Sequence, residues 1–249
     1  MADNLIKIKR GLDLPITGEP SQVIDGKPAI TRVAVLGPDY IDMRPTMAVR
    51  EGDAVKLGQL LFDDKKAPGV RFTAPGAGKV VAVNRGAKRI LQSVVIELAG
   101  AEEEIFSSYR ATPPDQLIRE QVRDLLLESG LWTALRTRPY SKIPPPDQIP
   151  HSIFVTAMDT TPLAADPEVI IAANENDFAA GLAALEKLTD GTVFVCKARG
   201  SNMPTSSAAN AKSVEFSGPH PAGLPGTHTH RLFAFAPQPG YAAELEAAL

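Results

Sequence analysis

Three of the four histidines lie close together near the end of the sequence, and imidazole is a common zinc ligand and proton carrier. They are His220, His228 and His230. On a strand, the spacing of His228 and His230 would put both rings on one face, where they could ligate zinc if a third ligand were near. The segment Gly218–Gly226 is, however, rich in proline and glycine. We therefore interpret the cluster as surface histidines on a structural loop.

Arg136 and Arg138 form a second candidate for chemistry, just before Pro139. Two guanidinium groups at this spacing could hold a carboxylate or phosphate, or pair with acidic groups of a partner protein. They could equally be solvated surface charges. We predict Arg136, Arg138, His220 and His228 as possible ligand or partner contacts, and we predict no catalytic residue and no metal site.

The segment Gly76–Lys79 has the look of a phosphate-binding loop but lacks its essential residues. A Walker loop needs glycine five residues before its final glycine and serine or threonine after the lysine, and Thr73 and Val80 occupy these places. A dinucleotide fingerprint would need glycine at Val81 and a helix afterwards. We predict a tight turn between two strands.

Cysteine content and charge exclude several classes of protein. Cys196 is the only cysteine, which rules out an intrachain disulfide and an all-cysteine metal or iron–sulfur cluster. Its place at the end of an apolar run predicts that its side chain is buried and structural. A net charge of -3 gives no positive field to gather phosphates, so we predict no nucleic-acid partner.

Size and hydropathy predict a globular protein without a membrane span. The chain has 249 residues, 44% of them hydrophobic, enough for one large domain or two modest ones. Apolar runs such as Val80–Val83 and Val169–Ala173 are far shorter than the ~20 residues of a spanning helix. The amino end lacks a signal-peptide core, so we expect a soluble cytoplasmic protein.

The region from residue 31 to residue 100 is predicted to be an all-β domain. Its apolar residues come in short bursts bounded by glycine or proline, which is typical of a small barrel or sandwich. The bursts are Thr31–Leu36, Ala54–Leu57, Leu60–Phe62, Val70–Thr73, Lys79–Val83 and Val94–Leu98.

Residues 101–249 are predicted to be an α/β domain with a mainly parallel sheet, and residues 1–30 an extension packing on the rest. Helical spacing predicts one helix from Pro113 to Gly130 and another from Asn174 or Asn176 to Leu188. Strands at Ile153–Thr156 and Val193–Cys196 flank the second helix in βαβ order. Pro144–Pro146 predicts an irregular linker, and Trp132 is predicted to anchor packing. Ala242–Leu249 is predicted to form a short helix or a frayed end.

Residues 47–86 resemble the biotinyl/lipoyl family of barrel-sandwich domains, through Val49–Leu61 and Thr73–Val80. Carrier members of that family present a lysine at a hairpin tip for covalent modification. Here the tip reads Asp63-Asp64-Lys65-Lys66-Ala67, with the lysine doubled and no Met-Lys-Met. The resemblance implies a scaffold domain with no covalently bound cofactor, and a carrier modified on Lys65 or Lys66 is the alternative.

Most of the chain, to about His230, resembles the A-subunit family of the sodium-translocating NADH:quinone reductases. The strings that carry this are Ile6–Ile16, Val35–Tyr40 with Met43–Met47, Phe72–Pro75 with Lys88–Ile96, and Gly218–His228. The resemblance implies a peripheral subunit on the cytoplasmic face of the bacterial inner membrane, docked on integral membrane subunits. The whole complex would oxidise NADH, reduce ubiquinone and export sodium. This subunit would serve as a non-catalytic scaffold with a possible quinone contact, and a stand-alone quinone- or nucleotide-binding module is a further alternative.

The α/β half is also similar, more distantly, to the flavoprotein subunit of respiratory complex I. Such relatives carry a glycine-rich loop after the first helix, where the backbone approaches flavin phosphate. The matching segment here contains the bulky residues Leu131, Trp132 and Leu135, which implies that the flavin site is lost. Members of the A-subunit family continue into a further domain, which we expect to be absent here because Arg231–Pro237 does not resemble their continuation.

Overall fold

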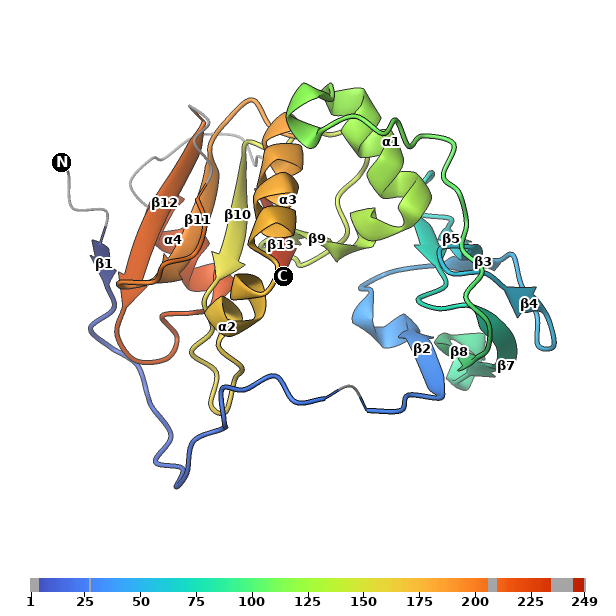
Figure 1. Ribbon diagram of the computed structural model, residues 1–249, viewed down its shortest axis with the longest axis horizontal. Helices are drawn as coiled ribbons and strands as arrows, with labels where there is room; N and C mark the ends of the chain where they lie inside the picture. Colours follow the sequence, from blue (N-terminus) through green and yellow to red (C-terminus); the bar gives the residue numbers. More distant parts are fainter. Residues whose placement is uncertain (1–4, 27, 206–209, 234–243, 249) are drawn as a thin grey trace.

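The computed structural model describes residues 5–26, 28–205, 210–233 and 244–248 of the chain. They form a domain of two small antiparallel sheets and a domain with one larger, helix-covered sheet (Figure 1). The barrel-sandwich and α/β domains predicted from the sequence are therefore both present.

The barrel-sandwich domain pairs its strands in the orders β2-β8-β7-β4 and β3-β5-β6. Its elements are β2 (Arg32–Leu36), η1 (Gly37–Asp39), β3 (Pro45–Met47), β4 (Ala54–Val55), β5 (Leu60–Asp64), β6 (Arg71–Thr73), β7 (Gly78–Arg85), η2 (Ala87–Arg89) and β8 (Leu91–Leu98). Each predicted strand segment corresponds to one of these strands, and β3 was not predicted. The turn predicted at Gly76–Lys79 is shorter than expected, because Gly78 and Lys79 already belong to β7. The rings of Phe62 and Phe72 stack in the core with centroids 4.6 Å apart.

The α/β domain is built on a six-stranded sheet of order β1-β12-β11-β10-β13-β9. Its strands are β1 (Leu5–Lys7), β9 (Leu135–Arg138), β10 (Ser152–Ala157), β11 (Val193–Ala198), β12 (Ala211–Ser217) and β13 (Glu244–Ala248). All neighbouring strands are parallel except β13 and β9. The prediction of a mainly parallel sheet is confirmed, and the amino-terminal segment supplies its edge strand β1.

Both faces of this sheet are buried. Successive side chains of a strand point to opposite faces, and in the central strands the side chains on both faces are apolar. In β10, Ile153 and Val155 face the core that extends into the barrel-sandwich domain, whereas Phe154 belongs to a second core. Cys196 lies in that second core with no exposed surface, and burial raises the pKa of its thiol. The prediction of a buried structural cysteine is confirmed.

Helices cover the sheet on opposite sides, with α3 on one face and α4 on the other (Figure 1). The helical elements are η3 (Pro114–Gln116), α1 (Arg119–Ser129), η4 (Leu131–Ala134), α2 (Pro167–Ala172), α3 (Glu175–Lys187) and α4 (Pro225–Phe233). Among the residues that the structure describes, no helix has the length and apolarity needed to cross a bilayer.

Three predicted boundaries or element types are corrected. The first long helix begins at Arg119, because the residues after Pro113 form the separate turn η3 before the chain becomes α-helical. His228 and His230 lie in helix α4, which starts on Pro225, a residue pre-set for the first helical turn. Residues 244–248 form strand β13, since pairing with both β10 and β9 outweighs the helix propensity of alanine and glutamate.

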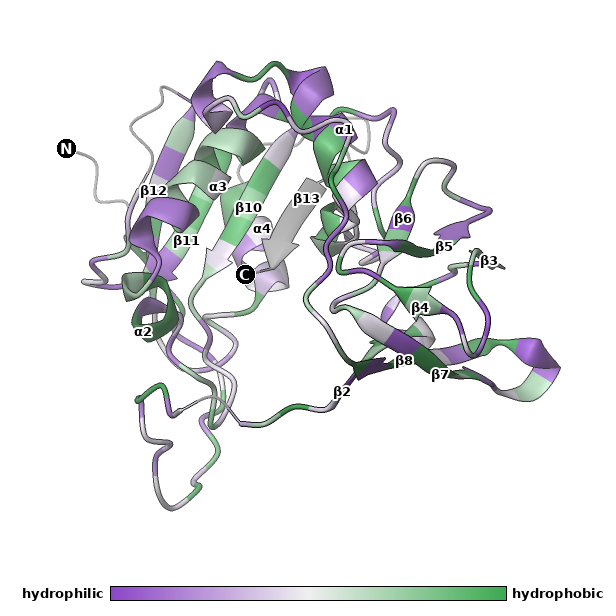
Figure 2. Cartoon of the chain, turned by 45° about the vertical axis from the view of Figure 1, so that its right-hand side comes forward, coloured by the Kyte–Doolittle hydropathy of each residue, from purple (hydrophilic) through white to green (hydrophobic). Residues whose placement is uncertain are grey.

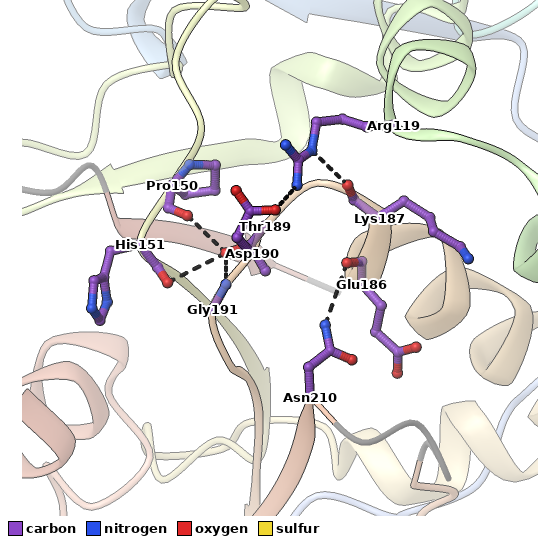
Figure 3. Close-up of polar contacts among 9 residues, drawn as sticks. All are labelled: Arg119, Pro150, His151, Glu186, Lys187, Thr189, Asp190, Gly191 and Asn210. Carbon is purple, nitrogen blue, oxygen red and sulfur yellow. Dashed lines mark hydrogen bonds and ion pairs between the residues drawn. The ribbon is translucent and has the colours of Figure 1, made fainter.

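A polar network closes the amino end of the sheet (Figure 3). The Thr189 hydroxyl donates to the Pro150 carbonyl oxygen at 2.7 Å and accepts from the Gly191 amide at 3.0 Å. Arg119, at the start of α1, donates from Nε to the Lys187 carbonyl oxygen at 2.9 Å. Since Lys187 ends α3, this guanidinium satisfies a free carbonyl group of the helix and joins α1 to α3.

The two domains share one hydrophobic core, which contains Leu61 and Phe72 from the first and Trp132 and Ile153 from the second. Polar contacts reinforce the junction.

The connecting segment is tied to α1, because the backbone amides of Ser107 and Ser108 donate to the Glu128 carboxylate at 3.0 and 2.7 Å. Hydrogen bonds to this carboxylate, led by the Ser108 hydroxyl, lower the pKa of Glu128 to about 2. These charge-assisted hydrogen bonds hold the connecting segment on the α/β domain, and the shared core joins the two domains.

Candidate functional site

A cavity of about 560 Å³ opens beyond the carboxyl ends of β10, β11 and β12. Open parallel sheets bind ligands at this edge, because the strand ends and following loops form a crevice there. The polar residues that line it are Gln22, Asp159, Thr160, Asp166, Glu168, Arg199, Ser201 and Ser217. This cavity, the carboxyl-edge pocket, is the candidate site in the α/β domain.

The carboxylates of the carboxyl-edge pocket are already engaged by the protein. The Asp159 Oδ1 atom accepts from the Thr161 amide at 2.7 Å, and Glu168 Oε1 accepts from the Asn202 amide at 3.1 Å. Hydrogen bonds from the Ser201 side chain and from the Asn202 amide lower the pKa of Glu168. These groups stabilise loops around the pocket and offer hydrogen bonds to a polar ligand.

Within the described ranges, no group of three histidine, cysteine or acidic side chains could hold a metal ion. Gln22 reaches the pocket from the amino-terminal segment, where its side chain accepts from the Asp166 amide at 2.8 Å. Gln22 thus joins the amino-terminal segment to the wall of the pocket.

The proline–glycine loop, residues 218–226, folds over Thr160 at the border of this pocket. His220 is half-buried, and its Nδ1 atom lies 3.0 Å from the Thr160 carbonyl oxygen. The His220 peptide nitrogen donates to Asp13 Oδ1 at 3.0 Å. Gly223 has to be glycine for close packing, since a Cβ atom there would lie 2.5 Å from the Thr160 nitrogen. His220 thus helps to position the loop, and contact with a ligand stays a prediction.

His228 is fully buried, so the interpretation as a surface histidine is wrong for this residue. Helix α4 turns its ring toward the sheet, where the ring centroid lies 4.3 Å from that of Phe216. Its Nε2–H donates to the Ala222 carbonyl oxygen at 2.8 Å. Burial lowers the pKa of His228 to about 4, so the ring is neutral near pH 7. The residue fixes the proline–glycine loop to the sheet.

Arg136 and Arg138 lie on β9 and are half-buried. The Arg136 guanidinium donates to the carbonyl oxygens of Thr133 and Leu135 and lies 5.4 Å from the centre of the Tyr40 ring in the barrel-sandwich domain. A cation over an aromatic ring is a stabilising contact. Arg136 therefore links the two domains, and the ligand or partner role of both arginines stays a prediction.

Two of the three bulky residues at the expected flavin loop, Trp132 and Leu135, pack in the domain junction, whereas Leu131 does not. Trp132 and Leu135 are buried, and the Trp132 indole donates to the Pro144 carbonyl oxygen at 2.9 Å. The prediction that Trp132 anchors packing is confirmed. Leu131 is 62% exposed and lies with Leu135 and Phe178 around an almost wholly apolar cavity of about 240 Å³ between α1 and α3.

Gly130, the residue before this segment, is expected to tolerate no side chain. It has φ +83°, and a Cβ atom would lie 2.4 Å from Thr73 Oγ1, which donates to the Ser129 carbonyl oxygen at 2.8 Å. Gly130→Ala should lower the free energy of unfolding by about 1–3 kcal/mol, measured by chemical denaturation. Gly52→Ala is the matched control, because Gly52 has φ +97° with open space around it. Equal losses would show that the Thr73 contact contributes nothing.

The Lys65–Lys66 hairpin between β5 and β6 is exposed at its tip but fixed at its base. Asp64, only 7% exposed, accepts from the Arg44 amide at 2.8 Å and from the Lys66 amide at 3.0 Å. These bonds fix the first turn of the hairpin and tie it to the segment before β3.

Asp64→Ala should lower the free energy of unfolding by about 1–3 kcal/mol, because two amides lose their acceptor. Asp63→Ala, on the preceding strand residue, is the control and should cost less. Denaturant unfolding monitored by circular dichroism checks this, and equal effects would contradict the capping role of Asp64.

Several pocket residues were missed by sequence reasoning. A signal for Asp159 and Thr160 existed, since polar residues directly after a buried strand mark the carboxyl edge of a parallel sheet. Gln22 had no such signal, because it reaches the pocket only through the path of the amino-terminal segment.

Comparison with known proteins identifies both domains. Residues 6–99 match the family described as "NqrA N-terminal barrel-sandwich hybrid domain", and residues 117–238 match the "NqrA second alpha/beta domain". The chain is 58% identical to proteins named as the A subunit of the Na(+)-translocating NADH-quinone reductase, in Vibrio atlanticus over 229 residues, in Saccharophagus degradans over 228 and in Neisseria gonorrhoeae over 226. These alignments cover 91–92% of this chain and 51% of each relative, so the chain spans about half the length of the curated relatives it matches. With two domains that match models of one family, the chain belongs to the NqrA family.

Proposed function

We propose that this chain acts as the NqrA component of a sodium-pumping respiratory complex that oxidises NADH and reduces ubiquinone. The observation that carries the proposal is its 58% identity, over 92% of its length, to proteins named as that component. In this role it is a peripheral protein on the cytoplasmic face of the bacterial inner membrane, docked on integral membrane subunits of the complex.

We further propose that this component is a scaffold without a catalytic side chain and without a covalently bound cofactor. The continuous core through both domains supports a rigid docking body. The packing of Trp132 at the expected flavin loop supports loss of a cofactor site there. We also propose that the α/β domain is distantly related to the flavoprotein subunit of complex I and shares its fold.

A quinone contact is the second candidate function, favoured by the apolar cavity that Leu131 and Leu135 help to line. Its walls suit an aliphatic or aromatic group, and Arg136 follows directly on the same strand. Isothermal titration with a short-chain ubiquinone should produce heat that is lost in a Leu135→Asp variant. Titrations with NADH and FMN are the comparison, and heat from those ligands alone would contradict the quinone contact.

The docking proposal is tested by reconstitution. The tagged chain is mixed with detergent-solubilised complex that lacks its NqrA component, and the co-purifying subunits are identified. We expect specific capture of the other subunits, with the Vibrio atlanticus relative as positive control. If the relative associates and this chain does not, the docking proposal fails for the part of the protein that this chain contains.

Intact mass spectrometry tests the carrier alternative. From cells with active lipoylation and biotinylation, the chain is expected to have its unmodified mass. An added mass that disappears in a Lys65→Arg/Lys66→Arg variant would replace the scaffold proposal with a carrier function.

A further inference from the structure

A second cavity, of about 640 Å³, lies on the barrel-sandwich domain and is strongly basic. We call it the basic hollow. Its charged lining consists of Arg44, Lys66, Arg85, Lys88, Arg89 and Asp42. The cations come from three separate places in the chain: the segment before β3, the β5–β6 hairpin, and the β7–β8 hairpin. Folding thus gathers five positive groups in a protein whose net charge is negative.

The positive charge of the basic hollow is hardly compensated by the protein. Asp42, the acid in its lining, is paired with Lys142 at an Oδ2–Nζ distance of 2.5 Å and is also attracted by Lys66, so it offsets only part of the five positive charges. Within the described part of the chain, none of the five cations forms an ion pair. Groups held at this density repel one another, so their gathering raises the free energy unless an anion binds.

The turn that presents two of these cations is locally unfavourable. Lys88 and Arg89 both have positive φ, +54° and +61°, at the centre of the turn closed by the Ile90 amide and the Ala87 carbonyl oxygen at 3.2 Å. Hairpin turns of this kind favour Asn-Gly, because a side chain at positive φ is strained. A turn that departs from its preferred residues at both central positions indicates a selected role for the side chains.

Exposed aliphatic side chains lie beside the cations. Ile41 and Ile90 both line the basic hollow and are 50% and 59% exposed. Figure 2 shows that the β7–β8 hairpin projects from the barrel-sandwich domain, away from the large sheet. Cations next to exposed aliphatic groups are characteristic of surfaces that rest in the interfacial layer of a bilayer, where lysine and arginine meet phosphates and aliphatic groups enter the acyl boundary. An acidic protein surface would account for the cations but would leave the isoleucines without apolar neighbours.

We propose that the basic hollow binds the phosphate groups of anionic lipids and so holds the barrel-sandwich domain against the membrane surface. This is a contact with lipid, additional to docking on other subunits. Its biological setting rests on the proposed function, but the interaction itself is a property of this chain.

The experiment is sedimentation of the purified chain with vesicles, without any other subunit. Vesicles of phosphatidylcholine alone are compared with vesicles of phosphatidylcholine and phosphatidylglycerol in equal parts. We expect binding to the anionic vesicles that weakens steeply with added salt, because exposed charges are screened over about 10 Å at 0.1 M. Lys88→Gln/Arg89→Gln should weaken the partition coefficient by about 25-fold, at about fivefold for each cation.

The matched control is Lys79→Gln/Lys212→Gln, which removes the same charge elsewhere. Both side chains are exposed, Lys79 at the opposite end of β7 and Lys212 on β12 of the other domain. This variant should bind anionic vesicles nearly as well as the parent. Equal weakening by the two double variants would overturn the proposal, since only overall charge would then matter.

A further variant separates lipid binding from folding. Lys88→Asn/Arg89→Gly supplies the residues that the turn prefers, so it should keep or raise the thermal midpoint while weakening vesicle binding as much as Lys88→Gln/Arg89→Gln does. Unchanged vesicle binding in this variant would overturn the proposal. Stronger binding of the parent to polyglutamate than to anionic vesicles would do the same and point to an acidic protein. Because no other subunit is present, neither result bears on the reconstitution that tests docking on the complex.

Discussion

Trp132→Ala should destabilise the protein by about 3–5 kcal/mol, the range expected when a large buried aromatic residue is truncated. Trp132 is 2% exposed and lies in the core that both domains share. The variant leaves a cavity at that junction and removes the donor to the Pro144 carbonyl oxygen. Urea unfolding measures the loss, and we expect the two domains to lose stability together.

Trp132→Phe is the control for this experiment. It keeps most of the ring volume and removes only the indole donor, so it should cost less than half as much as alanine. A loss below about 1 kcal/mol for Trp132→Ala would mean that the site collapses without a cavity. The tryptophan would then not be the anchor of the domain junction.

Acidification should remove about 3 kcal/mol of stability through His228 alone, between pH 6.5 and pH 4. Burial lowers the pKa of His228 from 6.5 to about 4, so the unfolded chain binds a proton in this range that the folded chain does not. The contribution is fully present above pH 6.5 and is lost as the pH falls toward 4. Each pKa unit corresponds to about 1.4 kcal/mol.

The measurement compares the free energy of unfolding at a series of pH values in the parent and in His228→Gln. Glutamine can donate to the Ala222 carbonyl oxygen without titrating, so this variant should show a shallower loss between pH 6.5 and 4. His230→Gln is the matched control, because His230 is exposed on the same helix. The assignment fails if His228→Gln and the parent lose stability in parallel.

Every strand of the barrel-sandwich domain except β3 could be predicted, because local residues set where these strands begin and end. Glycine and proline separate the short apolar segments between Thr31 and Leu98, and the turns that they form need no distant partner. The helix α3 was predicted for the same reason, since its apolar residues repeat at helical spacing. The junction role of Trp132 followed from its size and its place after a helix end.

No residue that lines the carboxyl-edge pocket was predicted from the sequence. Arg136 and His220 were selected for their chemistry, but the structure uses both in internal contacts, with Tyr40 and Thr160. Gln22 lies far from these residues in the sequence and reaches the pocket through a long segment without a periodic pattern. A site of this kind depends on long-range packing, which no local pattern describes.

The sequence by itself was sufficient to predict most strands of the barrel-sandwich domain, helix α3 and the burial of Cys196, and to show that no nucleotide-binding fingerprint is present. Each of these features depends on residues within a few positions of one another. Tertiary packing assigned His228 to a buried helix face and residues 244–248 to a strand between two others, and it gathered cations from three separate segments in one hollow. The physical reason is that burial, strand pairing and charge density are set by groups far apart in the chain. Local propensity is too weak, at about 1 kcal/mol or less for most residues, to oppose them.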